Sequence, residues 1–141
     1  MYEYKFKIDR VVDGDTVDGF IDLGFGVILK ERVRLMGIDA PETYLQKSIK
    51  NIEDRKKEKK AGLKAKARLK ELLKIGGSQP EGLFIKTFFD KKGKYGRVLG
   101  DIKYVYAKDL FNHNPNSKPW VGWKSINNQL LAENLVKSIK K

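Results

Sequence analysis

Three short motifs hold the residues of this sequence whose types and spacing could do chemistry. Residues 13–16 read Asp-Gly-Asp-Thr, residues 34–42 read Arg-Leu-Met-Gly-Ile-Asp-Ala-Pro-Glu, and residues 94–97 read Lys-Tyr-Gly-Arg. They place carboxylates and guanidinium groups at the ends of predicted strands. Carboxylate oxygens bind hard cations, arginines match the oxygens of a phosphate, and a further carboxylate can order a water molecule. The combination predicts metal-assisted hydrolysis of a phosphodiester.

Each motif taken alone also has a purely structural interpretation. Asp-Gly is first of all a hairpin-turn signal, and an arginine on a strand is usually a surface residue. A glutamate after a proline is common in loops and at helix starts. The single histidine, His113, lies in an Asn-rich segment and is predicted to be a loop residue rather than a base. Only the three motifs together, in this order, favour the functional interpretation.

The composition favours a polyanionic partner. The 141 residues include 30 Lys and Arg against 18 Asp and Glu, which gives a formal net charge of +12. Such a charge attracts nucleic acid through counterion release, although a lysine-rich surface that only confers solubility stays an alternative. A hydrophobic content of 40% is enough for the core of one domain, and we expect a single domain over residues 1–141.

The side chains available to a metal are restricted to oxygen donors. The chain has no cysteine and one histidine, which excludes disulfides, thiolate metal sites, cysteine nucleophiles and histidine-rich metal sites. A bound metal is therefore expected to be Ca²⁺ or Mg²⁺ rather than Zn²⁺.

The sequence leaves the cellular compartment open. Its N-terminus lacks the apolar run of a signal peptide, and no stretch approaches the length needed to span a membrane. We expect no membrane partner, and either a cytoplasmic protein or a mature secreted form with an added methionine.

Alternation of apolar and polar residues predicts an extended meander at the start of the chain. Val33 and Leu35 share one face of its third strand, so Arg34 should point away from the core. Five strands are predicted in all, over residues 2–8, 17–23, 27–35, 83–89 and 98–106.

Helical periodicity appears in two places. Apolar residues at three- and four-residue spacing predict a helix over residues 61–73 that stops at the following glycines, after a polar, basic and solvated stretch over residues 46–60. A second helix is predicted over residues 126–136 with Ser125 as its N-cap, after a long loop over residues 109–124. Five strands with a helix between the third and the fourth fit a small OB-type barrel, whose open face commonly receives nucleic acid.

The order of the three motifs resembles the signature of staphylococcal nuclease-like (thermonuclease) domains. The resemblance covers residues from about 5 to about 136. It implies a mainly β fold with α, a five-stranded OB-fold barrel with two capping helices (α+β). It also implies a Ca²⁺-dependent nuclease that hydrolyses DNA and RNA and leaves 3′-phosphate ends.

The resemblance also assigns a metal site. Asp15 and Asp39 match the carboxylate ligands of Ca²⁺, and the backbone carbonyl of Ala40 matches a third ligand. Asp13 matches a position near the ion but outside its ligands.

The remaining matched residues face the substrate in the family. Glu42 matches the residue that orients and activates the attacking water, and Arg34 and Arg97 match the pair that grips the phosphate. Lys94 and Tyr95 match residues near the phosphate of the bound nucleotide.

The sequence departs from the family where the best-known members have tyrosines that flank the nucleotide. No aromatic residue follows Trp123. Tyr44, Tyr95, Trp120 or Trp123 could stack on bases instead, and the two tryptophans could equally anchor their loop against the barrel.

Three functions therefore compete at this point. The first is a monomeric nuclease acting on DNA, RNA or both, in single-stranded or frayed form. The second is a catalytically weak or inactive OB-fold module that binds nucleic acid or protein, and the third is a lysine-rich accessory protein.

Overall fold

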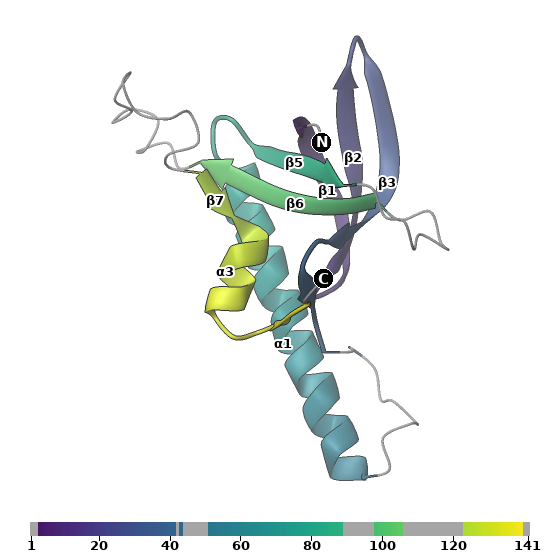
Figure 1. The fold of residues 1–141 in the computed structure, drawn as a ribbon, viewed down its shortest axis with the longest axis vertical. Coiled ribbons are helices and arrows are strands. Elements are labelled where there is room, and N and C mark those ends of the chain that lie inside the picture. Colours follow the sequence, from purple (N-terminus) through teal and green to yellow (C-terminus); the bar gives the residue numbers. More distant parts are fainter. Residues whose placement is uncertain (1–2, 42, 44–50, 89–97, 106–122, 140–141) are drawn as a thin grey trace.

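The fold is an antiparallel sheet that closes on itself. We describe it from a computed structural model, which defines residues 3–41, 43, 51–88, 98–105 and 123–139. Six strands follow the order β3-β2-β1-β5-β6-β7 in one sheet, and a parallel pairing of β3 with β6 closes it into a five-stranded barrel (Figure 1). Their bounds are β1 (Glu3–Asp13), β2 (Thr16–Gly24), β3 (Val27–Leu35), β5 (Leu83–Phe88), β6 (Val98–Val105) and β7 (Trp123–Ser125).

The predicted period-two pattern sets which side chains enter the barrel. Phe6, Val17, Ile21 and Val33 alternate with solvent-facing residues and are buried, as expected for strands covered on one face. At the closure, Gly100 on β6 lies opposite Leu35 on β3, and a Cβ atom there would lie 3.0 Å from Val33 Cγ1 of β3 and 2.6 Å from Ile85 Cδ1 of β5. The barrel therefore closes where a residue without a side chain lets two strands approach. The expected OB-type barrel with two capping helices is confirmed.

Helix α1 (Ile52–Gly77) begins nine residues before the predicted start at residue 61. Residues 46–60 were interpreted as a solvated stretch without a helix; from Ile52 onward they are helical, and most of residues 52–60 are exposed, as a solvated stretch would be. Asn51 caps the helix by accepting a hydrogen bond from Glu53 N at 2.9 Å, and acidic residues in the first turn suit the positive end of the helix dipole. The first turns carry no apolar stripe because they extend past the barrel (Figure 1), so periodicity could not detect them.

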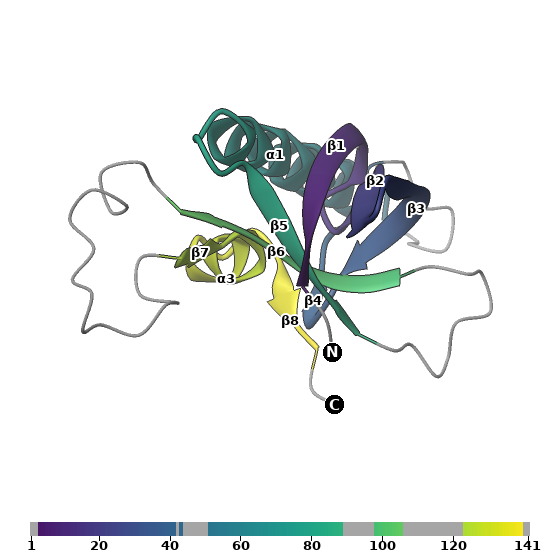
Figure 2. The same cartoon turned by 90° about the horizontal axis from the view of Figure 1, so that it is seen from above.

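The second half of α1 packs on the barrel. Ala65, Leu69, Leu72 and Leu73 are buried there, as predicted from their spacing. Helix α3 (Ile126–Ala132) lies beside α1 (Figures 1 and 2). Together the two helices cover one end of the core.

The C-terminal part of the chain is only partly helical. Ser125 Oγ accepts a hydrogen bond from Asn128 N at 3.2 Å, which confirms the predicted N-cap. The helix stops at Ala132, four residues before the predicted end, and Asn134 takes a positive φ of 57°. The chain then forms β8 (Lys137–Ser138), which pairs with β4 (Ile38–Asp39). Strands of two residues are too short to produce a sequence period.

Candidate active site

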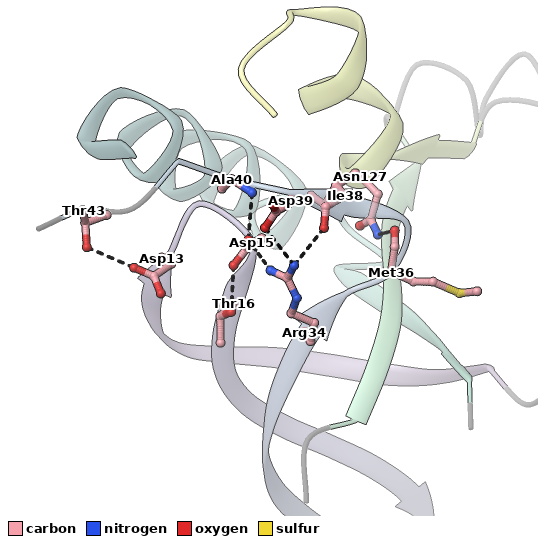
Figure 3. Close-up of polar contacts among 10 residues, drawn as sticks. All are labelled: Asp13, Asp15, Thr16, Arg34, Met36, Ile38, Asp39, Ala40, Thr43 and Asn127. Carbon is pink, nitrogen blue, oxygen red and sulfur yellow. Dashed lines mark hydrogen bonds and ion pairs between the residues drawn. The ribbon is translucent and has the colours of Figure 1, made fainter. Parts of the chain in front are cut away.

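A polar pocket lies at the end of the barrel where β1 turns into β2 and β3 leads into β4. Its volume is about 220 Å³. Two of the three sequence motifs supply its lining, which consists of Asp13, Asp15, Thr16, Arg34, Asp39, Ala40 and Pro41. Figure 3 shows the polar contacts among these residues. The fold therefore brings residues 13–16 and 34–41 together, as predicted.

Asp15 is the buried carboxylate of the pocket, with a residue exposure of 6%. Its Oδ2 accepts a hydrogen bond from Ala40 N at 2.8 Å, and its Oδ1 accepts one from Thr16 Oγ1 at 2.9 Å. Its backbone carbonyl accepts from Leu35 N at 2.7 Å. Contacts to two different segments hold the carboxylate in one orientation, which is what a ligand or a catalytic group requires.

Arg34 bridges the two aspartates of the pocket. Its Nη1 forms an ion pair with Asp15, and its Nη2 lies 3.2 Å from Asp39 Oδ1. Nη2 also donates to the carbonyl of Ile38 at 3.1 Å. The guanidinium therefore lies between the two carboxylates (Figure 3), as expected from the outward direction of residue 34 on β3.

The same contacts keep Arg34 charged. Burial of the guanidinium disfavours its charged form, but hydrogen bonds and charge attraction from Asp15 and then Asp39 outweigh that cost and raise the pKa of Arg34 above its usual value. Asp39 is more open to solvent, with a side-chain exposure of 59%. The pocket thus pairs one buried and one accessible carboxylate with a permanent cation.

Two glycines shape the backbone around the pocket. A Cβ atom at Gly14 would lie 2.8 Å from Ala65 Cβ and 2.9 Å from Ala40 Cβ, so the β1–β2 turn contacts both α1 and the residue after Asp39. Gly37 has a φ of 79°, a conformation that other residues rarely adopt. Gly14 therefore allows close packing, whereas Gly37 allows the backbone turn between β3 and β4.

Asn127 supports the site, although the sequence analysis did not identify it. Its side chain is buried on α3 and donates to Met36 O at 2.9 Å and to Gly100 O at 3.1 Å. These bonds fix the end of β3 immediately before the turn that carries Asp39 (Figure 3). A single asparagine in a polar run offers no sequence signal, because its role depends on partners 91 and 27 residues away.

A further hydrogen bond connects the segment after Pro41 to the β1–β2 turn. Thr43 Oγ1 donates to Asp13 Oδ1 at 3.0 Å. Asp13 therefore lies at the pocket and binds Thr43, and its position outside the metal ligands stays a prediction.

Four predicted site residues lie outside the described residues: Glu42, Lys94, Tyr95 and Arg97. The same holds for the aromatic candidates Tyr44 and Trp120 and for the side chain of Trp123. Their assignments stay predictions.

The described donors suit a hard cation. Asp15 and Asp39 supply carboxylate oxygens around a position that already attracts positive charge, that of the Arg34 guanidinium. Within the described ranges, no group of three or more His, Cys, Asp and Glu side chains is close enough to hold a metal ion. A cation would therefore need further oxygens, such as the Ala40 carbonyl, water or a phosphate.

By its fold and its site, the protein is a small OB-type barrel with an aspartate–arginine pocket at one end. The sequence matches the family described as staphylococcal nuclease homologue over residues 32–140. The chain belongs to this staphylococcal nuclease family.

One curated relative is also similar. The chain is 37% identical over 100 residues to a Bacillus subtilis (strain 168) protein named Endonuclease YhcR. The matched region covers 71% of this chain and 7% of that protein. The similarity is thus to a small part of a much longer relative.

Proposed function

We propose that this protein is a nuclease that hydrolyses phosphodiester bonds of DNA, RNA or both. The observation that carries the proposal is the convergence of Asp15, Arg34 and Asp39 in one polar pocket. A phosphodiester gains negative charge in its transition state, so a fixed guanidinium beside cation-binding carboxylates can stabilise that state. Family membership and the endonuclease name of the relative support the same activity.

We propose Ca²⁺ as the cofactor. Asp15, Asp39 and the carbonyl of Ala40 would hold it, since oxygen donors of this kind are typical Ca²⁺ ligands. When bound, the ion would polarise the phosphate and favour deprotonation of a nearby water.

The side chains of this protein would bind the phosphate and orient the attacking water. Arg34 would exchange its contacts with the aspartates for contacts with phosphate oxygens once a cation balances those carboxylates. Arg97 would bind the same phosphate, and Glu42 would orient the attacking water and accept its proton. Lys94 and Tyr95 would bind the substrate near the phosphate.

The finer points of this proposal follow from the family resemblance. They are cleavage to 3′-phosphate ends, action on single-stranded or frayed substrates, and a monomeric state.

Digestion assays test the proposal directly. We expect single-stranded DNA and RNA to be cleaved with Ca²⁺ and to stay intact when a chelator is added. Asp15→Asn should abolish cleavage, whereas Asp18→Asn should preserve it, because Asp18, three residues later on β2, pairs with Arg10 and Arg32 and does not line the pocket. Cleavage that resists the chelator would refute the metal-dependent mechanism.

One observation favours the alternative of a binding module without turnover. Both carboxylates are already paired with Arg34, which would suit a site whose charges serve only to stabilise the fold. This alternative predicts binding without cleavage, with log affinity falling against log salt by about 0.7 per phosphate contact on a single strand.

A further inference from the structure

The β2–β3 hairpin projects from the barrel (Figure 1). Its end carries exposed apolar side chains. Phe25, at its turn, is fully exposed and has a positive φ of 54° between two glycines. Ile28 is 60% exposed. Of the eight large hydrophobic residues that are exposed in the described chain, five lie in this seven-residue segment: Leu23, Phe25, Val27, Ile28 and Leu29. We call these five residues the apolar tip. Such a concentration marks an interaction site.

The apolar tip has no single contact face. Ile28 alternates with Val27 and Leu29 along β3, so these side chains point to opposite faces of the ribbon. Phe25 lies beyond both faces, at the turn. A flat protein surface would cover one face and leave the other in water. A medium that surrounds the hairpin would cover all of it.

Lysines surround the base of the same hairpin. Lys5 lies opposite Asp22, and Lys7 and Lys30 lie on either side of Phe20 in the strand register. A hollow of about 400 Å³ between them is lined partly by Lys5, Lys7, Phe20 and Ile28. Asp22, Phe20 and Lys30, which mark the levels of these lysines along the hairpin, lie three to five residues from Phe25 at the turn. This corresponds to roughly 10–16 Å. Apolar elements commonly enter the boundary between headgroups and acyl chains to about 5–10 Å, so the lysines would lie at headgroup level.

The acidic residue nearest the tip is already engaged. Asp22 Oδ1 accepts a hydrogen bond from Gly24 N at 2.8 Å and thereby stabilises the turn. Asp9, beside the base, pairs with Lys30 at 3.3 Å. Lys5 and Lys7 thus present exposed ammonium groups beside Asp22 and Glu31, and the wider attraction to anionic lipid comes from the net charge of +12 of the chain.

We propose that the β2–β3 hairpin docks this protein on a bilayer of anionic phospholipid, with the apolar tip inserted and Lys5, Lys7 and Lys30 at the headgroups. The expectation of no membrane partner rested on the lack of a spanning segment, and an interfacial hairpin needs none. Thr16 and Arg34, which are paired at the other end of the same strands, each lie nine residues from Phe25 at the turn, roughly 30 Å away. The candidate active site would thus stay in solvent, so this inference is independent of the proposed nuclease activity.

Vesicle sedimentation tests this inference. We expect the protein to bind vesicles of phosphatidylcholine with phosphatidylglycerol much better than vesicles of phosphatidylcholine alone. Phe25→Ser should weaken binding by about tenfold or more, because it removes a large apolar group from the inserted segment. Leu63→Ser is the matched control, since Leu63 is an exposed apolar residue on α1, and it should bind as the unchanged protein does. Equal binding by both variants would show attraction by charge alone and would overturn the proposal.

A site-specific probe gives an independent measurement. The chain has no cysteine, so Phe25→Cys and Leu63→Cys each provide one site for a polarity-sensitive dye. Vesicles should shift the emission of the dye at position 25 to shorter wavelength and leave position 63 unchanged. No shift at position 25 would overturn the proposal.

Two further outcomes would reassign the hairpin. If Phe25→Ser converts a dimer to a monomer in sedimentation velocity and leaves vesicle binding unchanged, the tip binds a second copy. If it weakens binding to DNA instead, the tip contacts nucleic acid. Cleavage of free DNA by Phe25→Ser should otherwise be normal.

Discussion

At the scale of single residues, the candidate site depends on charges that neutralise one another at close range. Arg34 contacts both Asp15 and Asp39, and its partners raise its pKa. Such an arrangement is stable without substrate, and a cation at the carboxylates would release the guanidinium for a phosphate. The role of Arg34 in turnover can therefore be separated from a general effect of positive charge.

Replacement of Arg34 provides that separation. We expect Arg34→Ala to lower kcat about 10²–10³-fold, the usual cost of removing one donor that stabilises transition-state charge. Arg32→Ala is the matched control, because Arg32 lies two residues away on the same strand and pairs with Asp18. Initial rates on single-stranded DNA measure both, with thermal unfolding as a check of folding. Equal losses in the two variants would contradict a specific role for Arg34.

Asn127 should contribute to stability through its hydrogen bonds rather than its size. Asn127→Ala leaves the carbonyls of Met36 and Gly100 without this partner, which should lower the free energy of unfolding by about 2–3 kcal/mol. The neighbouring Asn128 is exposed, so Asn128→Ala should change the free energy of unfolding by less than about 0.5 kcal/mol. Urea unfolding measures the difference. A similar loss in both variants would assign the effect to the helix rather than to the buried bonds.

At the scale of elements, the site exists because α1 packs against the β1–β2 turn. Gly14 is the contact point, with Ala65 on one side and Ala40 on the other. The packing of these segments places Asp15 beside Ala40. The carboxylate of Asp15 accepts a hydrogen bond from the backbone amide of Ala40. Any side chain at position 14 would push the turn, the helix and the segment after Asp39 apart.

Gly14→Ala should therefore destabilise the fold by about 1–3 kcal/mol, the usual cost of overpacking. Gly77→Ala is the control, since a Cβ atom there meets no atom within 4 Å. It lies in the last turn of α1 and should be neutral or stabilising by up to about 1 kcal/mol. Thermal and urea unfolding of both variants test this expectation, and an equal effect at the two positions would refute the packing argument.

At the scale of the whole molecule, two ion-paired carboxylates connect distant parts of the chain. Glu133, after α3, accepts hydrogen bonds from Arg68 on α1 at 2.8 and 3.1 Å. Asp18 on β2 accepts from Arg32 on β3 and from Arg10 on β1. The hydrogen bonds from Arg68 and then Gln129 lower the pKa of Glu133, and the hydrogen bond from Arg32 is the main reason that the pKa of Asp18 is lowered.

These pairs should make stability depend on pH in the acid range. Because both pKa values are lower in the folded state, their contributions are present above the ordinary carboxylate pKa of about 4 and disappear as the pH falls through the folded values. Glu133→Gln should flatten this dependence below pH of about 4, since glutamine does not titrate. Urea unfolding at a series of pH values measures the slope. An unchanged slope in Glu133→Gln would show that its folded pKa is not lowered.

Much of the fold could be predicted from the sequence, because the signals are local. Alternation along the first three strands and the leucine spacing of α1 each reflect one buried face, so they appear within a few residues. The start of α1 was placed too late, since its first turns extend past the barrel and bury no stripe. The pairs β4–β8 and β6–β7 were missed because β4, β7 and β8 are only two or three residues long.

The sequence by itself determined the chemistry that is available: oxygen donors, arginines and glycines in a fixed order, without cysteine. It could not determine which of them meet. The contacts of Asp15 with Ala40 and of Asn127 with Met36 span 25 and 91 residues, and such contacts depend on barrel closure and helix packing. The tertiary structure also decided that the apolar end of the β2–β3 hairpin stays outside the core, because the barrel closes at Val33–Leu35 and leaves the earlier part of β3 beyond it.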